Sequence, residues 1–168
     1  MNKDFNEMID DLKKKISFTL FTYNGPPHKL EKLIMNYEYE VHEQALIYKY
    51  LLPDDRVLEL GGNIGTSSIL IDKILNNKKQ HVTVEPNLDI VKTLKRNKDL
   101  NNCNFEIVPG IISKPRKIYL HGDGWGGRIV EGVKSASPVK TYDFLELDKK
   151  YNFNVLFADC EGGMVQLI

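Results

Sequence analysis

The chain has 168 residues, 23 of them Lys or Arg and 23 Asp or Glu, so its formal net charge is zero and its length predicts one domain. A zero balance disfavours a nucleic-acid partner, no run approaches the roughly 18 apolar residues that span a membrane, and the charged residues 1–15 are unlike a secretory signal. The two cysteines, Cys103 and Cys160, fit neither a disulfide framework nor a metal-site spacing, so we expect a cytoplasmic protein with no nucleic-acid or membrane partner.

Residues 1–52 predict a helical N-terminal extension. Apolar residues recur there at helical spacing, which gives each helix one face that packs into a core. Asn, Gly and two Pro within 23–27 separate the first helix from the second, and Pro53 follows the end of the third. The three apolar stripes lie in residues 5–16, 30–37 and 41–51.

The pattern changes at Arg56, where short apolar runs begin to alternate with helical periodicity. Asn87 is suited to cap the second of the helices that follow. Strands are expected at 57–60, 81–85 and 105–108, with helices at 69–75 and 87–94. Strand, helix, strand, helix, strand at these spacings predicts a parallel sheet with crossover helices.

The stretch 117–130 departs from this rhythm. Two short strands flank a Gly-rich loop at 121–127, which predicts a β-hairpin insertion. A short helix is expected from Thr141 to Leu147. Residues 154–159 then predict a further buried strand, since nearly continuous apolar runs are typical of parallel sheets.

A glycine-rich turn follows the strand 57–60. It reads Glu59-Leu60-Gly61-Gly62-Asn63-Ile64-Gly65, and Glu85 ends the next strand twenty residues after the last glycine. Glycines allow positive φ and close approach of the backbone to a ligand, and an acid at the second strand end can accept hydrogen bonds from both ribose hydroxyls of a nucleoside. The spacing is not the G-x-G-x-x-G of a dinucleotide site. Acid-x-G-x-x-x-G instead resembles the motif of class I S-adenosylmethionine methyltransferases, and a tight turn without a ligand is the alternative.

This resemblance implies a set of cofactor-binding residues. The first acid and the loop would lie near the methionine part of S-adenosylmethionine, and the second acid near its ribose. The set comprises Glu59, Gly61, Gly62, Asn63, Gly65, Glu85, Pro86, Gly110 and Ile111. Tyr39, Glu40 and His42, just before the strand region, could cover the cofactor.

A closer resemblance is to the FkbM family of methyltransferases. The blocks that carry it, in the family's order, are residues 57–65, 84–87, 140–145 and 157–162, together with Asn97 and Asn101. It implies a Rossmann-like α/β fold for residues 53–168, with a parallel-rich sheet flanked by helices, and O-methyl transfer, often to a sugar or polyketide-like hydroxyl. Glu59 and Gly62 replace the usual Asp and Ala of the first block.

A larger departure from the family concerns the strands that such folds carry after the last block. We expect these C-terminal strands to be absent, which would leave Val155 to Ala158 as an exposed apolar edge. We therefore also expect continuing chain, or another chain as in a homodimer, to cover this edge.

Methyl transfer to a hydroxyl needs a base that accepts the hydroxyl proton. Asp159, at the carboxyl end of a central strand, is the first candidate, and Glu161 could orient the hydroxyl. The open alternatives are an N-cap for Asp159 and a first-turn carboxylate for Glu161. The pair could also hold a divalent cation, but no further ligand is evident and we assign no metal.

The Gly-rich loop is the second candidate region. His121 and Asp123 could form a base and its orienting partner, Trp125 could stack on a sugar or adenine, and Arg128 could bind an acceptor carboxylate or phosphate. A flexible hairpin tip with a packed Trp and a surface ion pair is the alternative. His28, His42 and His81 receive no catalytic role.

The sequence therefore predicts an S-adenosylmethionine-dependent O-methyltransferase. Its acceptor would be a small molecule or carbohydrate, such as a sugar in a glycan or nucleotide sugar. A non-catalytic nucleoside-binding or scaffold domain is one alternative. An NAD-dependent oxidoreductase is another, and the glycine spacing opposes it.

Overall fold

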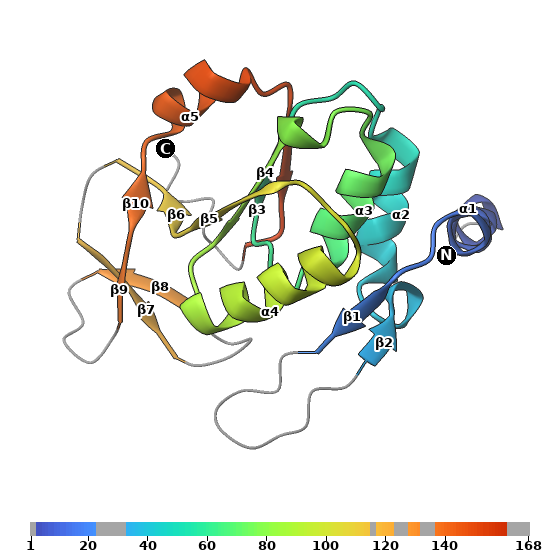
Figure 1. The fold of residues 1–168 in the computed structure, drawn as a ribbon, viewed down its shortest axis with the longest axis horizontal. Coiled ribbons are helices and arrows are strands. Elements are labelled where there is room, and N and C mark those ends of the chain that lie inside the picture. The colour runs from blue at the N-terminus through green and yellow to red at the C-terminus, as the bar shows by residue number, and fades with distance from the viewer. Residues whose placement is uncertain (1–2, 23–32, 115–116, 123–127, 132–136, 161–168) are drawn as a thin grey trace.

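A parallel four-stranded sheet forms the centre of the molecule (Figure 1). The computed structural model describes residues 3–22, 33–114, 117–122, 128–131 and 137–160. The sheet's strands are β3 (Val57–Leu60), β4 (His81–Glu85), β5 (Glu106–Pro109) and β11 (Val155–Ala158), in the order β11-β3-β4-β5. The strand of this sheet that comes first in the chain, β3, thus lies inside the sheet, with later strands added on both sides. This order is Rossmann-like and confirms the expected α/β fold with a parallel sheet flanked by helices.

The strand register brings the carboxyl ends of the four parallel strands to one edge of the sheet. Leu60, which ends β3, pairs with Val84 on one side and with Ala158 on the other. Glu85, which ends β4, pairs with Pro109 of β5. In open sheets of this kind, ligands bind outside the carboxyl ends of the strands, where the strand order reverses. Here that point lies between β3 and β11.

Alternate residues of each strand enter two different cores, as the two-residue period of a strand requires. On one face, Val57 packs with apolar residues of α2 (Val41–Tyr50), α3 (Thr66–Ile74) and α4 (Leu88–Leu100). On the other face, Leu58 and Val82 pack near Leu147 of α5 (Phe144–Tyr151). Asn87 caps α4 as predicted, because its side chain accepts from the backbone N–H groups of Asp89 and Ile90.

The N-terminal segment differs from the three helices expected. The first and third helices are present as α1 (Lys3–Lys15) and α2. The prediction of a second helix is wrong for residues 33–37, the part of it that the structure describes. There the chain forms β2 (Leu33–Met35), paired antiparallel with β1 (Thr19–Phe21), and then a short 3-10 turn, η1 (Asn36–Glu38). Leu33 and Ile34, expected on a helix stripe, instead pair with β1, with Ile34 opposite the fully buried Leu20, so tertiary pairing overrides the local periodicity.

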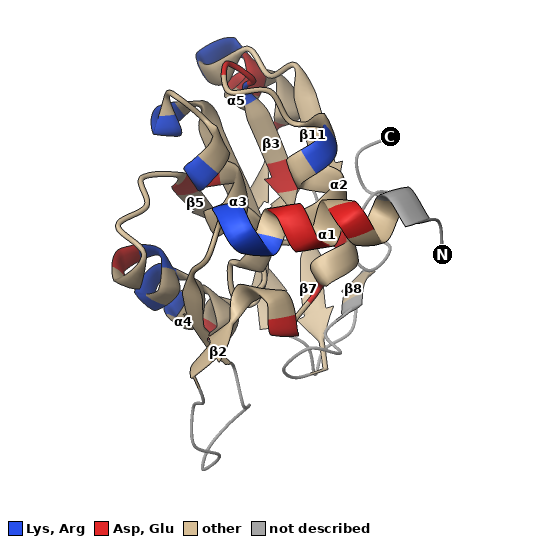
Figure 2. Cartoon of the chain, turned by 90° about the vertical axis from the view of Figure 1, so that its right-hand side faces the viewer, with Lys and Arg blue, Asp and Glu red and all other residues tan. Residues whose placement is uncertain are grey.

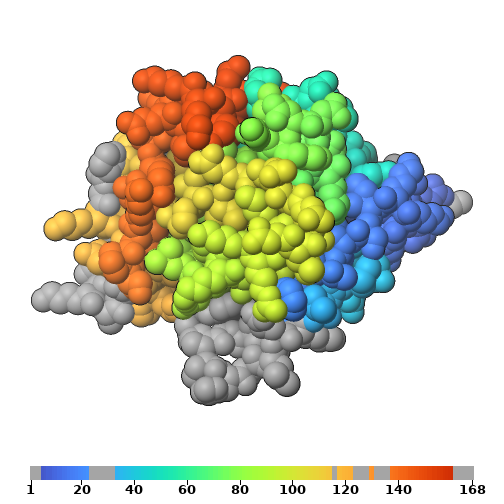
Figure 3. Space-filling view, in the orientation of Figure 1, coloured from blue at the N-terminus to red at the C-terminus, as the bar shows by residue number. Residues whose placement is uncertain are grey.

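Buried amide side chains fasten this segment to the sheet domain. Asn97 of α4 accepts from the Phe21 backbone N–H at 2.6 Å and donates to the carbonyls of Phe21 and Ile64 at 2.9 and 2.8 Å. Asn101 donates to the Thr19 carbonyl at 2.8 Å. In Figure 3 the blue N-terminal surface accordingly lies against the yellow-green surface of α4. One asparagine therefore ties β1 and the glycine turn to the same helix.

The hairpin insertion is confirmed, with one strand more than expected. β7 (Ile118–His121) pairs antiparallel with β8 (Arg128–Glu131), and its other edge pairs with β9 (Ser137–Val139). Two short strands, β6 (Ile111–Ile112) and β10 (Thr141–Tyr142), pair in parallel. The helix expected from Thr141 therefore begins only at Phe144, because Asp143 caps it by accepting from the Glu146 N–H at 3.1 Å.

The edge strand β11 is less buried than its apolar sequence predicts. Val155 and Phe157 are half-buried against the α2–α3 core, whereas Leu156 is 50% exposed. Within the described residues β11 pairs only with β3, so the expected exposed apolar edge is present. The prediction of a fully buried strand is wrong because burial on both faces needs a neighbour on each edge.

Two smaller features complete the fold. A second 3-10 turn, η2 (Lys78–Gln80), precedes β4. In Figure 2, acidic residues colour the middle of α1 red, and its last turn, which carries Lys13, Lys14 and Lys15, is blue. Among the helices described here, none is both long and apolar enough to cross a membrane.

Candidate cofactor site

The turn after β3 is held by its own backbone. The N–H groups of Gly61 and Gly62 both donate to the Val84 carbonyl, at 2.9 and 3.1 Å, and the Gly65 N–H donates to the Gly62 carbonyl at 2.8 Å. The backbone is left-handed at Gly61, Asn63 and Gly65, with φ of 89°, 46° and 98°. The chain thereby reverses from β3 into α3 within a few residues, as the glycine spacing predicts.

The close approaches that exclude side chains here are made by the protein itself. A Cβ at Gly61 would lie 1.9 Å from the Asp159 carbonyl oxygen, and one at Gly62 would lie 2.3 Å from the Thr83 hydroxyl oxygen. Gly61 therefore lets the loops after β3 and β11 cross in contact. The structure thus gives these glycines a role in packing one loop on another, and their contact with a ligand stays a prediction.

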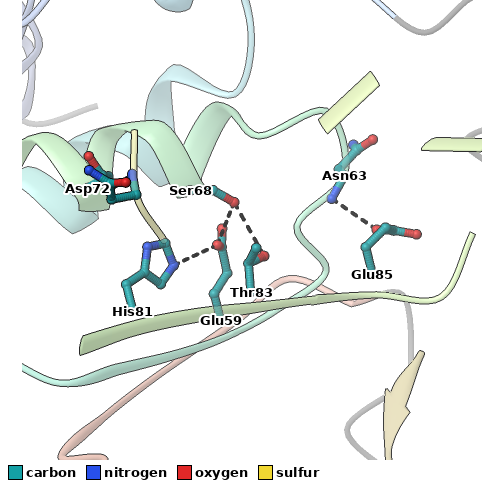
Figure 4. Close-up of polar contacts among 8 residues, drawn as sticks. Glu59, Asn63, Ser68, Asp72, His81, Thr83 and Glu85 are labelled. Atoms are coloured by element: carbon teal, nitrogen blue, oxygen red, sulfur yellow. Dashed lines mark hydrogen bonds and ion pairs between the residues drawn. The ribbon is translucent and has the colours of Figure 1, made fainter. Parts of the chain in front are cut away.

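Glu85 faces the glycine turn, as expected for a residue that binds a nucleoside there. It is 6% exposed, and its Oε2 accepts from the Asn63 N–H at 2.9 Å (Figure 4). Its Oε1 accepts from the Asn87 N–H at 2.8 Å. Burial raises the pKa of this carboxyl, and the two N–H donors partly oppose that rise. Each carboxylate oxygen keeps a second acceptor position, so the group can receive further hydrogen bonds.

Glu59 lies beneath the turn rather than on its open side. Its side chain is fully buried between β3 and α3, where Oε2 accepts from the Ser68 hydroxyl at 2.6 Å and lies 3.0 Å from His81 Nε2 (Figure 4). The Thr83 hydroxyl joins Ser68 at 3.3 Å. The structure thus gives Glu59 a supporting position below the loop that was expected to hold the ligand with it.

Sequence reasoning missed the partners of Glu59. The sequence analysis gives His81 no catalytic role, includes Thr83 only as part of a strand and assigns nothing to Ser68. A signal was present, because polar residues at 81 and 83 alternate with apolar ones in β4 and therefore share the face that Glu59 presents from β3.

A small apolar cavity lies at the carboxyl ends of the strands, on the face of the sheet opposite to Glu59. Its volume is about 40 Å³, and Gly61, Pro86, Gly110 and Ile111 of the predicted set all line it. Ile129 of the β8 hairpin strand lines it as well. The structure therefore brings four predicted residues together and adds the hairpin insertion as one wall.

The candidate catalytic residues fall in different places. Asp159 is exposed directly after β11, and its backbone N–H donates to the Leu60 carbonyl at 3.0 Å. His121 is exposed at the end of β7. Asp123, Trp125 and Glu161, as well as the side chain of Arg128, lie outside the described residues, so the proposed pairing of His121 with Asp123 stays a prediction.

The residues before α2 also reach this edge. Glu40 is half-buried, and burial raises its pKa to about 7, with the carboxylates of Asp159, Glu43 and Glu59 adding to the rise. Burial raises the pKa of the Tyr39 hydroxyl above its ordinary value, and this hydroxyl makes polar contacts with Glu40 and Asn63. The N-terminal segment thus contributes acidic and phenolic groups beside the glycine turn.

No metal centre is evident in the described part of the chain, where no three His, Cys, Asp or Glu side chains gather closely enough to hold an ion.

Comparisons with known proteins give no family for the chain. No protein-family model matches it, and no curated protein does. Among solved structures, it is similar to a protein-L-isoaspartate O-methyltransferase, with a TM-score of 0.47 and 19% identity over 96% of this chain and 51% of that one. It is also similar to a Klebsiella pneumoniae protein assigned as an O-methyltransferase, with a TM-score of 0.37 and 16% identity over 65% of this chain and 44% of that one. The chain thus spans about half the length of these structures, and at such scores neither similarity bears on function.

Proposed function

We propose that the protein is an S-adenosylmethionine-dependent methyltransferase of class I that resembles the FkbM family and methylates a hydroxyl. The observation that carries this proposal is the position of Glu85 at the end of β4, bonded across to the glycine turn at the reversal of the strand order. A carboxylate with acceptor positions left at this point is suited to the two hydroxyls of a ribose.

The backbone of the turn favours a nucleoside without phosphate. Dinucleotide sites offer free N–H groups to a pyrophosphate. Here the N–H groups of Gly61, Gly62, Asn63 and Gly65 are all bonded within the protein, and one of their acceptors is the Glu85 carboxylate. An anionic phosphate would meet few donors and a like charge, which opposes the NAD-dependent alternative.

We assign the residues around the cavity to the rest of the cofactor. Pro86, Gly110 and Ile111 would contact the adenine, since flat aromatic rings are bound by apolar walls. Gly61 to Asn63 would lie along the methionine part, with Glu59 supporting that loop from below through Ser68 and His81. S-adenosylmethionine supplies an electrophilic methyl group on a sulfonium, and no step needs a metal.

Asp159 is the residue we propose as base. It follows the strand on the far side of the reversal point, and its loop contacts the glycine turn at Gly61. A carboxylate there can accept the acceptor hydroxyl's proton as the oxygen becomes methylated. Glu161 would orient the hydroxyl, and His121, Asp123, Trp125 and Arg128 would contact the acceptor from the hairpin.

The acceptor is proposed from the motif resemblance alone. The order of the FkbM-like blocks supports a sugar hydroxyl, in a glycan or a nucleotide sugar. The acceptor class is determined by measuring transfer of a labelled methyl group from S-adenosylmethionine to sugars, nucleotide sugars and polyketide-like alcohols, each offered separately.

The proposed cofactor is tested by calorimetric titration of the wild-type chain with S-adenosylmethionine, S-adenosylhomocysteine and NAD. We expect the first two to bind and NAD to give no heat of binding. Preferential binding of NAD would overturn the proposal. Binding of both sulfur nucleosides without methyl transfer to any offered class would support the non-catalytic nucleoside-binding domain.

A further inference from the structure

Glu40 has a backbone conformation that its residue type does not favour. It precedes α2 with φ of 50° and ψ of 40°, in the left-handed region. The other non-glycine residues with positive φ in the described ranges are all asparagines, at 63, 102 and 152, and asparagine tolerates this region far better than glutamate. Strain of this kind persists only where the surrounding structure enforces it, and it is concentrated at functional sites.

Helix capping does not account for the glutamate. The N-cap side chain usually accepts from an N–H of the first turn, but the Glu40 side chain makes no such bond. Only its backbone carbonyl takes part in the helix start, accepting from the Gln44 N–H at 3.1 Å, which any residue could do. The carboxyl group is therefore free of a capping role and directed elsewhere.

The charges of other acids act on this carboxyl group. After burial itself, the carboxylates of Asp159, Glu43 and Glu59 each raise the pKa of Glu40. Among the leading influences on this group, only the Tyr39 hydroxyl favours its ionised form. A half-buried carboxyl in such surroundings gains most from a cationic ligand.

An orphaned acceptor in the turn itself points to the same kind of ligand. Among the described atoms, the buried Asn63 Oδ1 has no hydrogen-bond partner. Buried acceptors are almost always satisfied. What this oxygen lacks is a donor, and an ammonium group carries three N–H donors with a positive charge.

We propose that Glu40 is a cofactor-binding residue whose carboxylate receives the α-ammonium group of S-adenosylmethionine beside the glycine turn. This inference rests on the function proposed above and assigns a residue from the N-terminal segment to the methionine end of the ligand. The ammonium offsets the repulsion from Asp159 and Glu59. A segment outside the sheet domain is thereby required for recognition of the amino-acid part.

The test compares Glu40→Gln with Glu43→Gln, a matched loss of charge three residues further along the chain. Affinities are measured for S-adenosylmethionine, S-adenosylhomocysteine and 5′-methylthioadenosine, which lacks the ammonium. We expect Glu40→Gln to weaken the first two about tenfold, the scale of one charged hydrogen bond. The third should change less than about twofold because it keeps only the adenosine contacts. Glu43→Gln removes a neighbouring charge but no proposed contact, so it should weaken none of the three by more than about twofold.

Proton release gives a second readout. Burial raises the pKa of Glu40 to about 7, so the carboxyl group is partly protonated near neutral pH, and a bound ammonium favours its ionised form. Titrations at pH 7 in two buffers of different ionisation enthalpy should show the wild type releasing protons with either ammonium-bearing ligand. Glu40→Gln should remove that release.

A third variant separates binding from folding. Glycine adopts the left-handed region without strain, so Glu40→Gly should unfold at or above the wild-type temperature and yet lose the same affinity. It also replaces the Gln variant in the comparison should that one not fold. An equal loss for all three ligands, or no loss for any, overturns the inference while leaving the proposed function intact. A wild-type chain that binds none of the three overturns both.

Discussion

On the β4 side of β3, polar groups bind the sheet and the glycine turn into one unit. Glu85 accepts from the turn at Asn63, and Ser68 joins Glu59 to Thr83 below it. On the β11 side, the contact is backbone against backbone, with Gly61 under the Asp159 carbonyl. There the next strand is half exposed and has no second neighbour among the described strands.

This difference separates two parts of the proposed reaction. The cofactor half is preorganised by internal hydrogen bonds, which fixes ligand groups without further ordering cost. The half that carries Asp159 depends on one strand pairing and one glycine contact. Mutations on the two sides of β3 should therefore have distinct signatures, in cofactor affinity on one side and in turnover or strand packing on the other.

The largest expected effect comes from breaking the contact between the two halves. Gly61→Ala places a Cβ within 1.9 Å of the Asp159 carbonyl oxygen at a positive φ, and we expect it to lower the free energy of unfolding by about 3–5 kcal/mol. The measurement is urea denaturation. Gly122→Ala is the control, since Gly122 shares a positive φ of 96° but lies exposed at the end of β7, and it should cost only about 1 kcal/mol. Equal losses would mean that the loops do not pack as described.

Asp159→Asn sharpens the comparison on the β11 side. Because the side chain is exposed, we expect stability and S-adenosylhomocysteine affinity to stay near wild type while turnover falls at least ~100-fold. Single-turnover methyl transfer with an accepted acceptor measures this. Near-wild-type turnover would remove Asp159 as the base and direct attention to the hairpin pair, His121 and Asp123.

Glu85→Ala gives the opposite signature on the β4 side. It removes a partner of the turn and the proposed ribose acceptor, so S-adenosylmethionine binding should weaken by about 1.5–3 kcal/mol. Glu106→Ala is the matched control, because Glu106 is an exposed carboxylate at the amino end of the adjacent strand. Calorimetry should show no change for the control. Equal affinities for wild type and Glu85→Ala would contradict the site assignment.

Sequence reasoning worked best on the β4 side and for a physical reason. The glycine turn and the N-cap Asn87 are local signals that the structure contains, and Glu85 lies against that turn, while its contact with a ribose stays a prediction. Sequence reasoning missed the features that depend on pairing between residues far apart in the chain. The 30–37 stretch has helical spacing but pairs as β2, and His81 meets Glu59 only because β3 and β4 align in register.

The conformation of Glu40 was also beyond a sequence pattern. Nothing in a glutamate before a helix predicts a positive φ, because the residue type disfavours it. Likewise, apolar composition predicted that Val155 to Ala158 form a strand, but burial depends on what lies against its outer edge. Local chemistry is readable along the chain, whereas the environment of an edge is set by segments far away in sequence.

The smallest expected effect concerns that outer edge. Leu156, with Tyr50 and Leu46 of α2, borders an apolar groove of about 470 Å³, and a strand edge with unpaired backbone groups can pair with another chain. We therefore expect this chain to self-associate with rising concentration. Leu156→Lys should weaken that association by about 1 kcal/mol, the share of a half-exposed leucine. Sedimentation velocity over a concentration series measures it. Leu145→Lys, at a leucine 64% exposed on α5, should leave association unchanged, and an equal effect of both substitutions would place the contact away from β11.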